Sequence, residues 1–80
     1  MMRGELIGIF SRPTAAKGKI HVYKDERSGH SVLRFMLHKK RRKKHLLTMP
    51  LAEFRRLSAA VLAKLDCNPQ DFRSVNGGRL

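Results

Sequence analysis

The chain has 80 residues, with 18 Lys or Arg against 6 Asp or Glu, and a formal net charge of +12. Its hydrophobic fraction of 41% is near the globular average, which excludes a purely disordered basic tail, and its length allows a single domain, residues 1–80. No apolar run is long enough for a signal peptide or a membrane span, and the lone Cys67 excludes an internal disulfide. We therefore expect an intracellular protein without a membrane partner, in the cytoplasm, nucleoid or nucleus.

Alternating apolar and polar residues predict an antiparallel sheet over residues 5–49. Turn-forming residues, among them Pro13, Gly18 and Gly29, separate the alternating segments. The expected strands are residues 5–10, 19–25, 31–39 and 45–49, all of ordinary length for a small sheet.

The alternation assigns side chains to the two faces of that sheet. Ile20 and Val22 point to one face, and His21 and Tyr23 point to the other. In the next strand, one face carries Leu33, Phe35 and Leu37, and the other carries Val32, Arg34, Met36 and His38.

Residues 50–66 repeat apolar side chains at helical spacing, with Pro50 in the first turn, and predict one amphipathic helix. Its apolar stripe is expected to supply both core and a dimer or partner interface, through Leu51, Phe54, Leu57, Val61, Leu62 and Leu65. Asn68 and Pro69 then start a short helical turn within residues 67–80, which otherwise form a frayed tail. The predicted fold class is α+β, a four-stranded antiparallel twisted sheet followed by one amphipathic helix and a short C-terminal extension.

The sequence offers little for catalysis, a cofactor or a small-molecule substrate. The acids are scattered singly, and no Ser, His and acid occur at a recognisable catalytic spacing. A metal site would have to use the histidines or Cys67, yet no metal-binding spacing is present, although His38 and His45 could face each other across a hairpin. We expect no enzyme, no catalytic residue, no cofactor and no bound metal.

A run of six consecutive cations follows the third expected strand. As a hairpin tip, this run allows three interpretations: a hydrated loop, a nuclear-import signal or a phosphate clamp. We favour the clamp because Lys19, Lys24 and Arg34 on the neighbouring strands extend the positive field onto the sheet. The expected phosphate-binding residues of the run are Lys39, Lys40, Arg41, Arg42, Lys43 and Lys44.

Tyr23 and His21 stand beside these cations on the face opposite Ile20 and Val22. Flat rings beside cations on an open sheet can stack unpaired bases, each stack contributing about 1 to 3 kcal/mol. The alternative interpretation is that Tyr23 closes a second small core or a dimer contact, because aromatic residues also favour interfaces.

Two short stretches resemble the positive-cofactor-four family, single-stranded DNA-binding transcriptional coactivators with bacterial and phage relatives. Residues 17–20, Lys-Gly-Lys-Ile, are similar to the entry into the family's second strand. Residues 47–49, Leu-Thr-Met, followed by Phe54 and Leu57, are similar to its junction between sheet and helix. The resemblance spans about residues 5–66.

This resemblance implies a homodimer in which helices pack together and two curved sheets offer basic channels for single strands. It implies strand-borne contacts from Lys17, Lys19 and Arg34, with the six-cation run as an elaboration of this chain. The chain departs from the family in having Pro50 and Leu51 at the helix start, in lacking tryptophan on the strands, and in its longer C-terminal end.

The sequence therefore predicts a non-enzymatic nucleic-acid-binding protein that prefers single-stranded DNA. Binding would use a basic sheet surface and hairpin with aromatic stacking, and the protein would act in transcription, replication or recombination. Two alternatives remain open: an RNA-binding or ribosome-associated protein, and a small adaptor that binds a protein partner through its helix.

Overall fold

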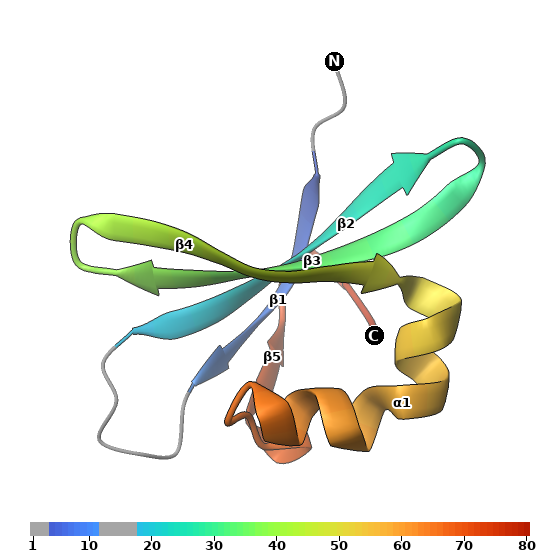
Figure 1. Cartoon of the computed structure of the whole chain (residues 1–80). Coiled ribbons are helices and arrows are strands. Elements are labelled where there is room, and N and C mark those ends of the chain that lie inside the picture. The colour runs from blue at the N-terminus through green and yellow to red at the C-terminus, as the bar shows by residue number, and fades with distance from the viewer. Residues whose placement is uncertain (1–3, 12–17) are drawn as a thin grey trace.

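A computed structural model describes residues 4–11 and 18–80 and has the predicted α+β class. Its elements are strands β1 (Glu5–Ser11), β2 (Lys19–Arg27), β3 (His30–Lys39) and β4 (Arg42–Pro50), helix α1 (Leu51–Lys64), a 3-10 helix η1 (Pro69–Asp71) and strand β5 (Phe72–Ser74). The strands form one antiparallel sheet in the order β4-β3-β2-β1-β5. Figure 1 shows the strong twist of this sheet, with α1 on one side of it.

The β2–β3 hairpin turns at Ser28 and Gly29, which have φ of 50° and 79°. Two successive positive φ values are typical of a type I′ turn, whose twist matches that of the flanking strands. The β3–β4 hairpin turns at Lys40 and Arg41, so β4 begins three residues earlier than predicted.

The strand register confirms the predicted faces. Tyr23 lies opposite Arg34 and His21 lies opposite Met36, so their side chains share one face. The other face holds the core, in which the fully buried side chains are Phe10, Ile20, Val22, Leu33 and Phe35. Burial of these side chains, together with Phe54 and Leu62 of α1, stabilises the packing of α1 on the sheet.

Helix α1 covers this core face with only part of its apolar stripe. Phe54 and Leu62 are buried, and the Phe54 ring lies 5.6 Å from the Phe35 ring. Leu57 has non-helical backbone angles, φ −115° and ψ 17°, and the helix bends there (Figure 1). Leu57 is 44% exposed. Of the residues predicted to form a partner interface, Phe54 and Leu62 therefore belong to the protein's own core, and Leu57 lies at the surface.

The start of α1 also differs from the prediction. Pro50 ends β4 and occupies the N-cap position with extended backbone angles, and no side chain caps the helix. Glu53 in the first turn and Lys64 in the last turn have favourable signs for the helix dipole.

Residues 67–80 hold the expected helical turn and a short strand that was not predicted. The side chain of Asn68 accepts a hydrogen bond from the Gln70 N–H at 3.1 Å. Strand β5 then pairs with β1, and the Phe72 ring lies 5.0 Å from the Phe10 ring. The last residues were expected to be frayed, yet the Gly78 N–H donates to the Val75 carbonyl at 2.9 Å, and the Ser74 hydroxyl donates to the Gly78 carbonyl at 2.7 Å.

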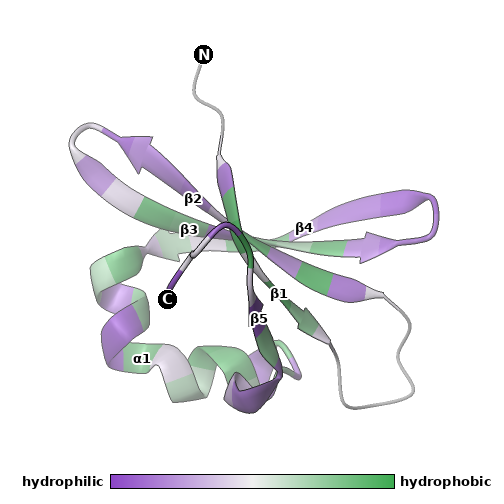
Figure 2. Cartoon of the chain, turned by 180° about the vertical axis from the view of Figure 1, so that it is seen from behind, coloured by the Kyte–Doolittle hydropathy of each residue, from purple (hydrophilic) through white to green (hydrophobic). Residues whose placement is uncertain are grey.

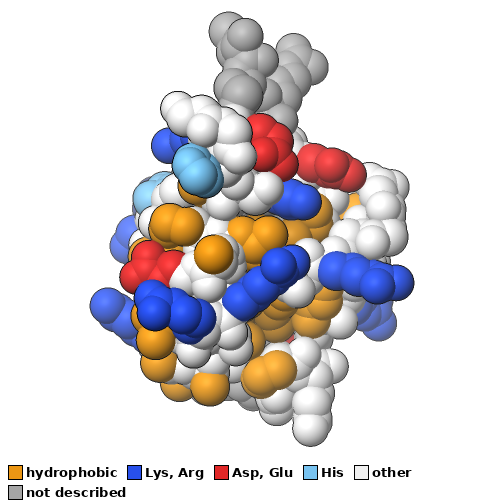
Figure 3. All heavy atoms as spheres, turned by 90° about the vertical axis from the view of Figure 1, so that its right-hand side faces the viewer, with side chains coloured by type: hydrophobic (Ala, Val, Ile, Leu, Met, Phe, Trp, Pro, Cys, Tyr) orange, Lys and Arg blue, Asp and Glu red, His pale blue; other side chains and the backbone are white. Residues whose placement is uncertain are grey.

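Hydrophobic side chains are not all enclosed by this fold. The face shown in Figure 3, which carries the bend of α1 and the β2–β3 hairpin, has apolar side chains interleaved with Lys and Arg at its surface. No helix within residues 4–11 and 18–80 has the length and apolar character needed to cross a membrane.

Candidate nucleic-acid interface

The sheet face opposite α1 carries the predicted rings together with several cations. Lys19 lies opposite His38, and His38 lies opposite Lys43 on the next strand. We call this surface the ring face and define it by residues Lys19, His21, Tyr23, Arg34, His38 and Lys43. Each strand contributes through the same two-residue alternation that places the core on the other side.

Two histidines form the centre of the ring face. The rings of His21 and His38 are parallel, with centroids 3.7 Å apart and 4° between their planes. Tyr23 lies beside them, 6.4 Å from His21 and 6.3 Å from His38. His21 and His38 cover one face of each other's ring, so their outer ring faces and the ring of Tyr23 are the flat surface, fixed by the sheet, on which a base can stack.

The surroundings of the two histidines favour their neutral forms. Burial lowers the pKa of His21, and His38, Lys43 and Lys19 lower it further because like charges oppose protonation. Burial and Lys43 likewise lower the pKa of His38. His21 Nδ1 is buried and has no hydrogen-bond partner within the described part of the chain.

A hollow of about 600 Å³ opens next to the stacked histidines. Its size falls in the range of small-ligand sites, about 300 to 1,000 Å³. Ring surface and lysine stems give the hollow apolar walls, and lysine ammonium groups stand around it. The lining residues are Gly18, Lys19, His21, His38, Lys39 and Lys40.

Arg34 belongs to the ring face, but its guanidinium is already engaged. Its Nε donates to Asp25 Oδ2 at 3.1 Å, and its Cζ lies 4.6 Å from the centroid of the Tyr23 ring. The Arg34 side chain is 28% exposed and that of Asp25 is 7% exposed. Arg34 therefore contacts the face of Tyr23, and Asp25 neutralises part of its charge.

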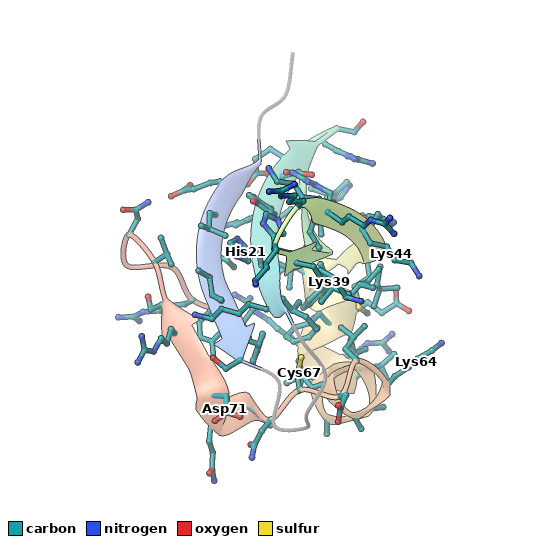
Figure 4. All side chains as sticks on the ribbon, turned by 90° about the vertical axis from the view of Figure 1, so that its left-hand side faces the viewer. His21, Lys39, Lys44, Lys64, Cys67 and Asp71 are labelled. Atoms are coloured by element: carbon teal, nitrogen blue, oxygen red, sulfur yellow. The ribbon has the colours of Figure 1, made fainter. Side chains whose placement is uncertain are left out.

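The six-cation run is not a simple hairpin tip. Only Lys40 and Arg41 form the turn, and the other four residues belong to β3 and β4. Lys43 lies opposite His38 on the ring face, whereas Lys44 lies opposite the buried Leu37. Figure 4 shows His21 and Lys44 on different sides of the β3–β4 hairpin. The run therefore presents charge on both faces of the ribbon.

Several other sequence predictions can be compared with the structure. Lys17 lies outside the described residues. Lys24 lies opposite Leu33, on the core side of the sheet and away from the ring face. His38 and His45 do not face each other, because His45 lies opposite Met36 and shares a 2.6 Å hydrogen bond with Thr48 Oγ1.

Within residues 4–11 and 18–80, no three His, Cys, Asp or Glu side chains are grouped so as to hold a metal ion. The parallel stack of His21 and His38 is also unsuited to chelation, because the two rings present faces to each other and their nitrogen lone pairs do not converge.

The sequence did not indicate two further residues of this surface. Arg73 reaches the ring side because β5 places it opposite Ile9, which in turn lies opposite His21. Asp25 is buried at the other end of the face. Arg73 could be assigned to this surface only by predicting β5. Asp25 could be assigned to it only by recognising that Arg34 is its diagonal neighbour on the adjacent strand.

A second hollow, of about 630 Å³, lies at the opposite end of the sheet between the β2–β3 hairpin and the start of α1. Arg27, His30 and Arg55 are among its lining residues. No aromatic stack lines it, so the ring face is the better candidate for contacts with bases.

The fold and this surface define a small α+β protein with an open, basic, ring-bearing sheet. No protein-family model, curated protein or solved structure matches the chain.

Proposed function

We propose that this chain is a non-enzymatic protein that binds single-stranded nucleic acid on the ring face of its sheet. The observation that carries the proposal is the parallel stack of His21 and His38 beside Tyr23, with Lys19 and Lys43 on the same face. Rings would stack on unpaired bases while the ammonium groups neutralise phosphates. Little sequence selectivity is expected, because every base has a face that can stack.

We propose DNA as the preferred strand and a role in transcription, replication or recombination. The resemblance of residues 17–20 and 47–49 to the positive-cofactor-four family supports this choice. RNA is the alternative ligand, and the presence of 2′-hydroxyl groups is the chemical difference that a binding site can use.

The experiment is a titration of matched single-stranded DNA, single-stranded RNA and duplex DNA at several salt concentrations. If about five phosphates are neutralised, the logarithm of affinity for a single strand falls with the logarithm of salt concentration with a slope near −3.5. Tyr23→Ala and Lys43→Gln should each weaken binding, whereas Lys64→Gln, at the end of α1 and away from His21 in Figure 4, should not. Salt-independent binding, or equal effects of Lys43→Gln and Lys64→Gln, would show that the ring face is not the site.

A second candidate function is binding to a protein partner through α1, including a second copy of this chain. The observation that favours it is Leu57, 44% exposed at the bend of the helix, with Val61 and Leu65 only partly buried nearby. A homodimer formed there would leave the ring face open, because α1 lies on the opposite side of the sheet. The two functions are therefore compatible.

A further inference from the structure

The end of the β3–β4 hairpin extends beyond the hydrophobic core. Leu37 is the last buried residue of β3, and all residues from 39 to 45 are exposed. Figure 2 shows this end of the hairpin as strongly hydrophilic, and in Figure 1 it projects away from α1 and β5. A ribbon of this kind is free to enter or lie against a ligand without disturbing the core.

The hairpin end carries cations on both faces. Lys43 belongs to the ring face, while Arg42 lies opposite Lys39 and Lys44 lies opposite Leu37 on the other side. We call Lys39, Arg42 and Lys44 the reverse face. Lys39, at the strand end, also borders the hollow beside His38, so Arg42 and Lys44 are the cations that belong to the reverse face alone.

The two faces differ in what they offer a nucleic acid. The ring face has three rings for unpaired bases, but the reverse face has cations without an exposed aromatic ring among the described residues; the nearest ring in β3, that of Phe35, is fully buried. Paired bases are already stacked on one another and present phosphates and groove edges instead. The reverse face is therefore suited to duplex and the ring face to a single strand.

The shape of the hairpin fits the same assignment. The major groove of B-DNA, about 12 Å wide, admits a two-stranded β-ribbon. The ribbon formed by β3 and β4 closes with only two turn residues, Lys40 and Arg41. Arg42 and Lys44 on its reverse face would meet phosphates of the groove, and β3 and β4 carry no Asp or Glu that would oppose this.

We propose that the preferred ligand of this chain is a junction, at which a single strand continues from a duplex. The single strand lies on the ring face, and the hairpin end contacts the duplex phosphates through Arg42 and Lys44. This inference rests on the proposed single-strand binding and names the class of nucleic acid that the site selects.

The test compares three DNA ligands with equal numbers of phosphates: a single strand, a blunt duplex and a duplex with a single-stranded overhang. The wild-type chain should bind the overhang ligand about tenfold or more tightly than either of the others, since two additional phosphate contacts contribute at this level at moderate salt. In Arg42→Gln/Lys44→Gln this advantage should be lost, while affinity for the single strand stays within about twofold.

A matched control removes two charges from the other face. Lys19→Gln/Lys43→Gln has the same net charge as the first variant, and all four residues are exposed, so neither variant should alter the fold. This control should weaken binding of the single strand and of the overhang ligand alike.

The outcomes separate the two proposals. If the wild-type chain binds the overhang ligand no more tightly than the single strand, the junction is not the ligand and single-strand binding stands. If the two variants weaken all three ligands equally, charge alone is responsible and the junction inference is again overturned. If none of the three ligands binds, the proposed function itself is wrong.

Discussion

The imidazole of His21 lies parallel to that of His38, with ring centroids 3.7 Å apart, although the two residues are not directly opposite in the sheet. His21 faces Met36 across the strands and His38 faces Lys19, so the contact is a diagonal one. Two imidazolium ions at this distance would repel each other, and Lys43 adds to the repulsion. The stack is therefore a feature of the neutral histidines.

Folding stability should decrease as the pH is lowered through the histidine range. The pKa of each ring is lowered in the folded chain, so below about pH 6.5 the unfolded chain takes up protons that the folded chain resists. The stability present above about pH 6.5 is thus lost as the pH falls towards the lowered pKa values. Urea unfolding at about pH 7.5 and 5.5 measures the loss.

Two histidine variants identify which groups cause this loss of stability at low pH. His21→Gln/His38→Gln should flatten the dependence on pH, whereas His30→Gln, at the exposed β2–β3 turn, should retain it. An unchanged slope in the double variant would assign the loss of stability to other groups.

Binding of a single strand should become tighter over the same range. Phosphates near His21 and His38 oppose the effect of the lysines and raise the pKa of the ring that lies nearer to them, so the complex takes up protons that the free protein does not. Each proton taken up strengthens binding by up to about tenfold per pH unit at constant ionic strength. Calorimetric titration in two buffers with different ionisation enthalpies counts these protons directly, and a count of zero would place the strand away from the stacked rings.

Arg34 and Asp25 should be coupled in a double-mutant cycle. Arg34→Ala leaves the Asp25 carboxylate nearly buried without its main donor, which should reduce the free energy of unfolding by about 1 to 3 kcal/mol. Adding Asp25→Ala should recover part of this loss, because no unpaired charge is then left in the sheet. Strictly additive losses, measured by urea unfolding, would mean that the two side chains do not stabilise each other.

The packing of β5 on β1 depends on Gly8, which has no side chain. A Cβ on Gly8 would collide with the ring of Phe72 and lie 2.9 Å from the Arg73 carbonyl oxygen. Gly8→Ala should therefore destabilise the chain by about 1 to 3 kcal/mol. Phe72→Leu in the same chain removes the ring atoms that collide and should restore part of the stability. Thermal unfolding measures the stability of both variants. A Gly8→Ala chain as stable as the wild type would show that the packing of Phe72 against β1 does not require glycine at position 8.

The faces of β2 and β3 could be predicted from sequence because strand alternation acts locally and has a period of two. Strand β5 could not, because three residues carry no clear alternation and it pairs with β1, more than 60 residues earlier in the chain. The early start of β4 was missed for a different reason. Lys43 and Lys44 have low strand preference, and the pairing with β3 overrides it.

The candidate site, like the fold, could be predicted only in part from the sequence. Alternation predicts that His21, Tyr23, Arg34 and His38 share a face, but it does not predict which of them touch. The stack of His21 on His38 and the ion pair between Arg34 and Asp25 both depend on the register between β2 and β3. A single sequence does not specify that register across a long hairpin. The division of the cation run between two faces depends on the register in the same way.

Leu57 provides the test of self-association. It is the only large hydrophobic residue classed as exposed among residues 4–11 and 18–80, so Leu57→Glu should change the free energy of unfolding of the isolated chain by no more than about 0.5 kcal/mol. If α1 forms the homodimer interface, placing a carboxylate there should convert a dimer into a monomer, because an unpaired charge at an apolar contact is costly. Sedimentation equilibrium measures the mass of wild type and variant, and Ala52→Glu, exposed in the first helical turn, is the control that should not change it. A wild-type mass equal to that of Leu57→Glu would mean that this helix does not pair two copies of the chain.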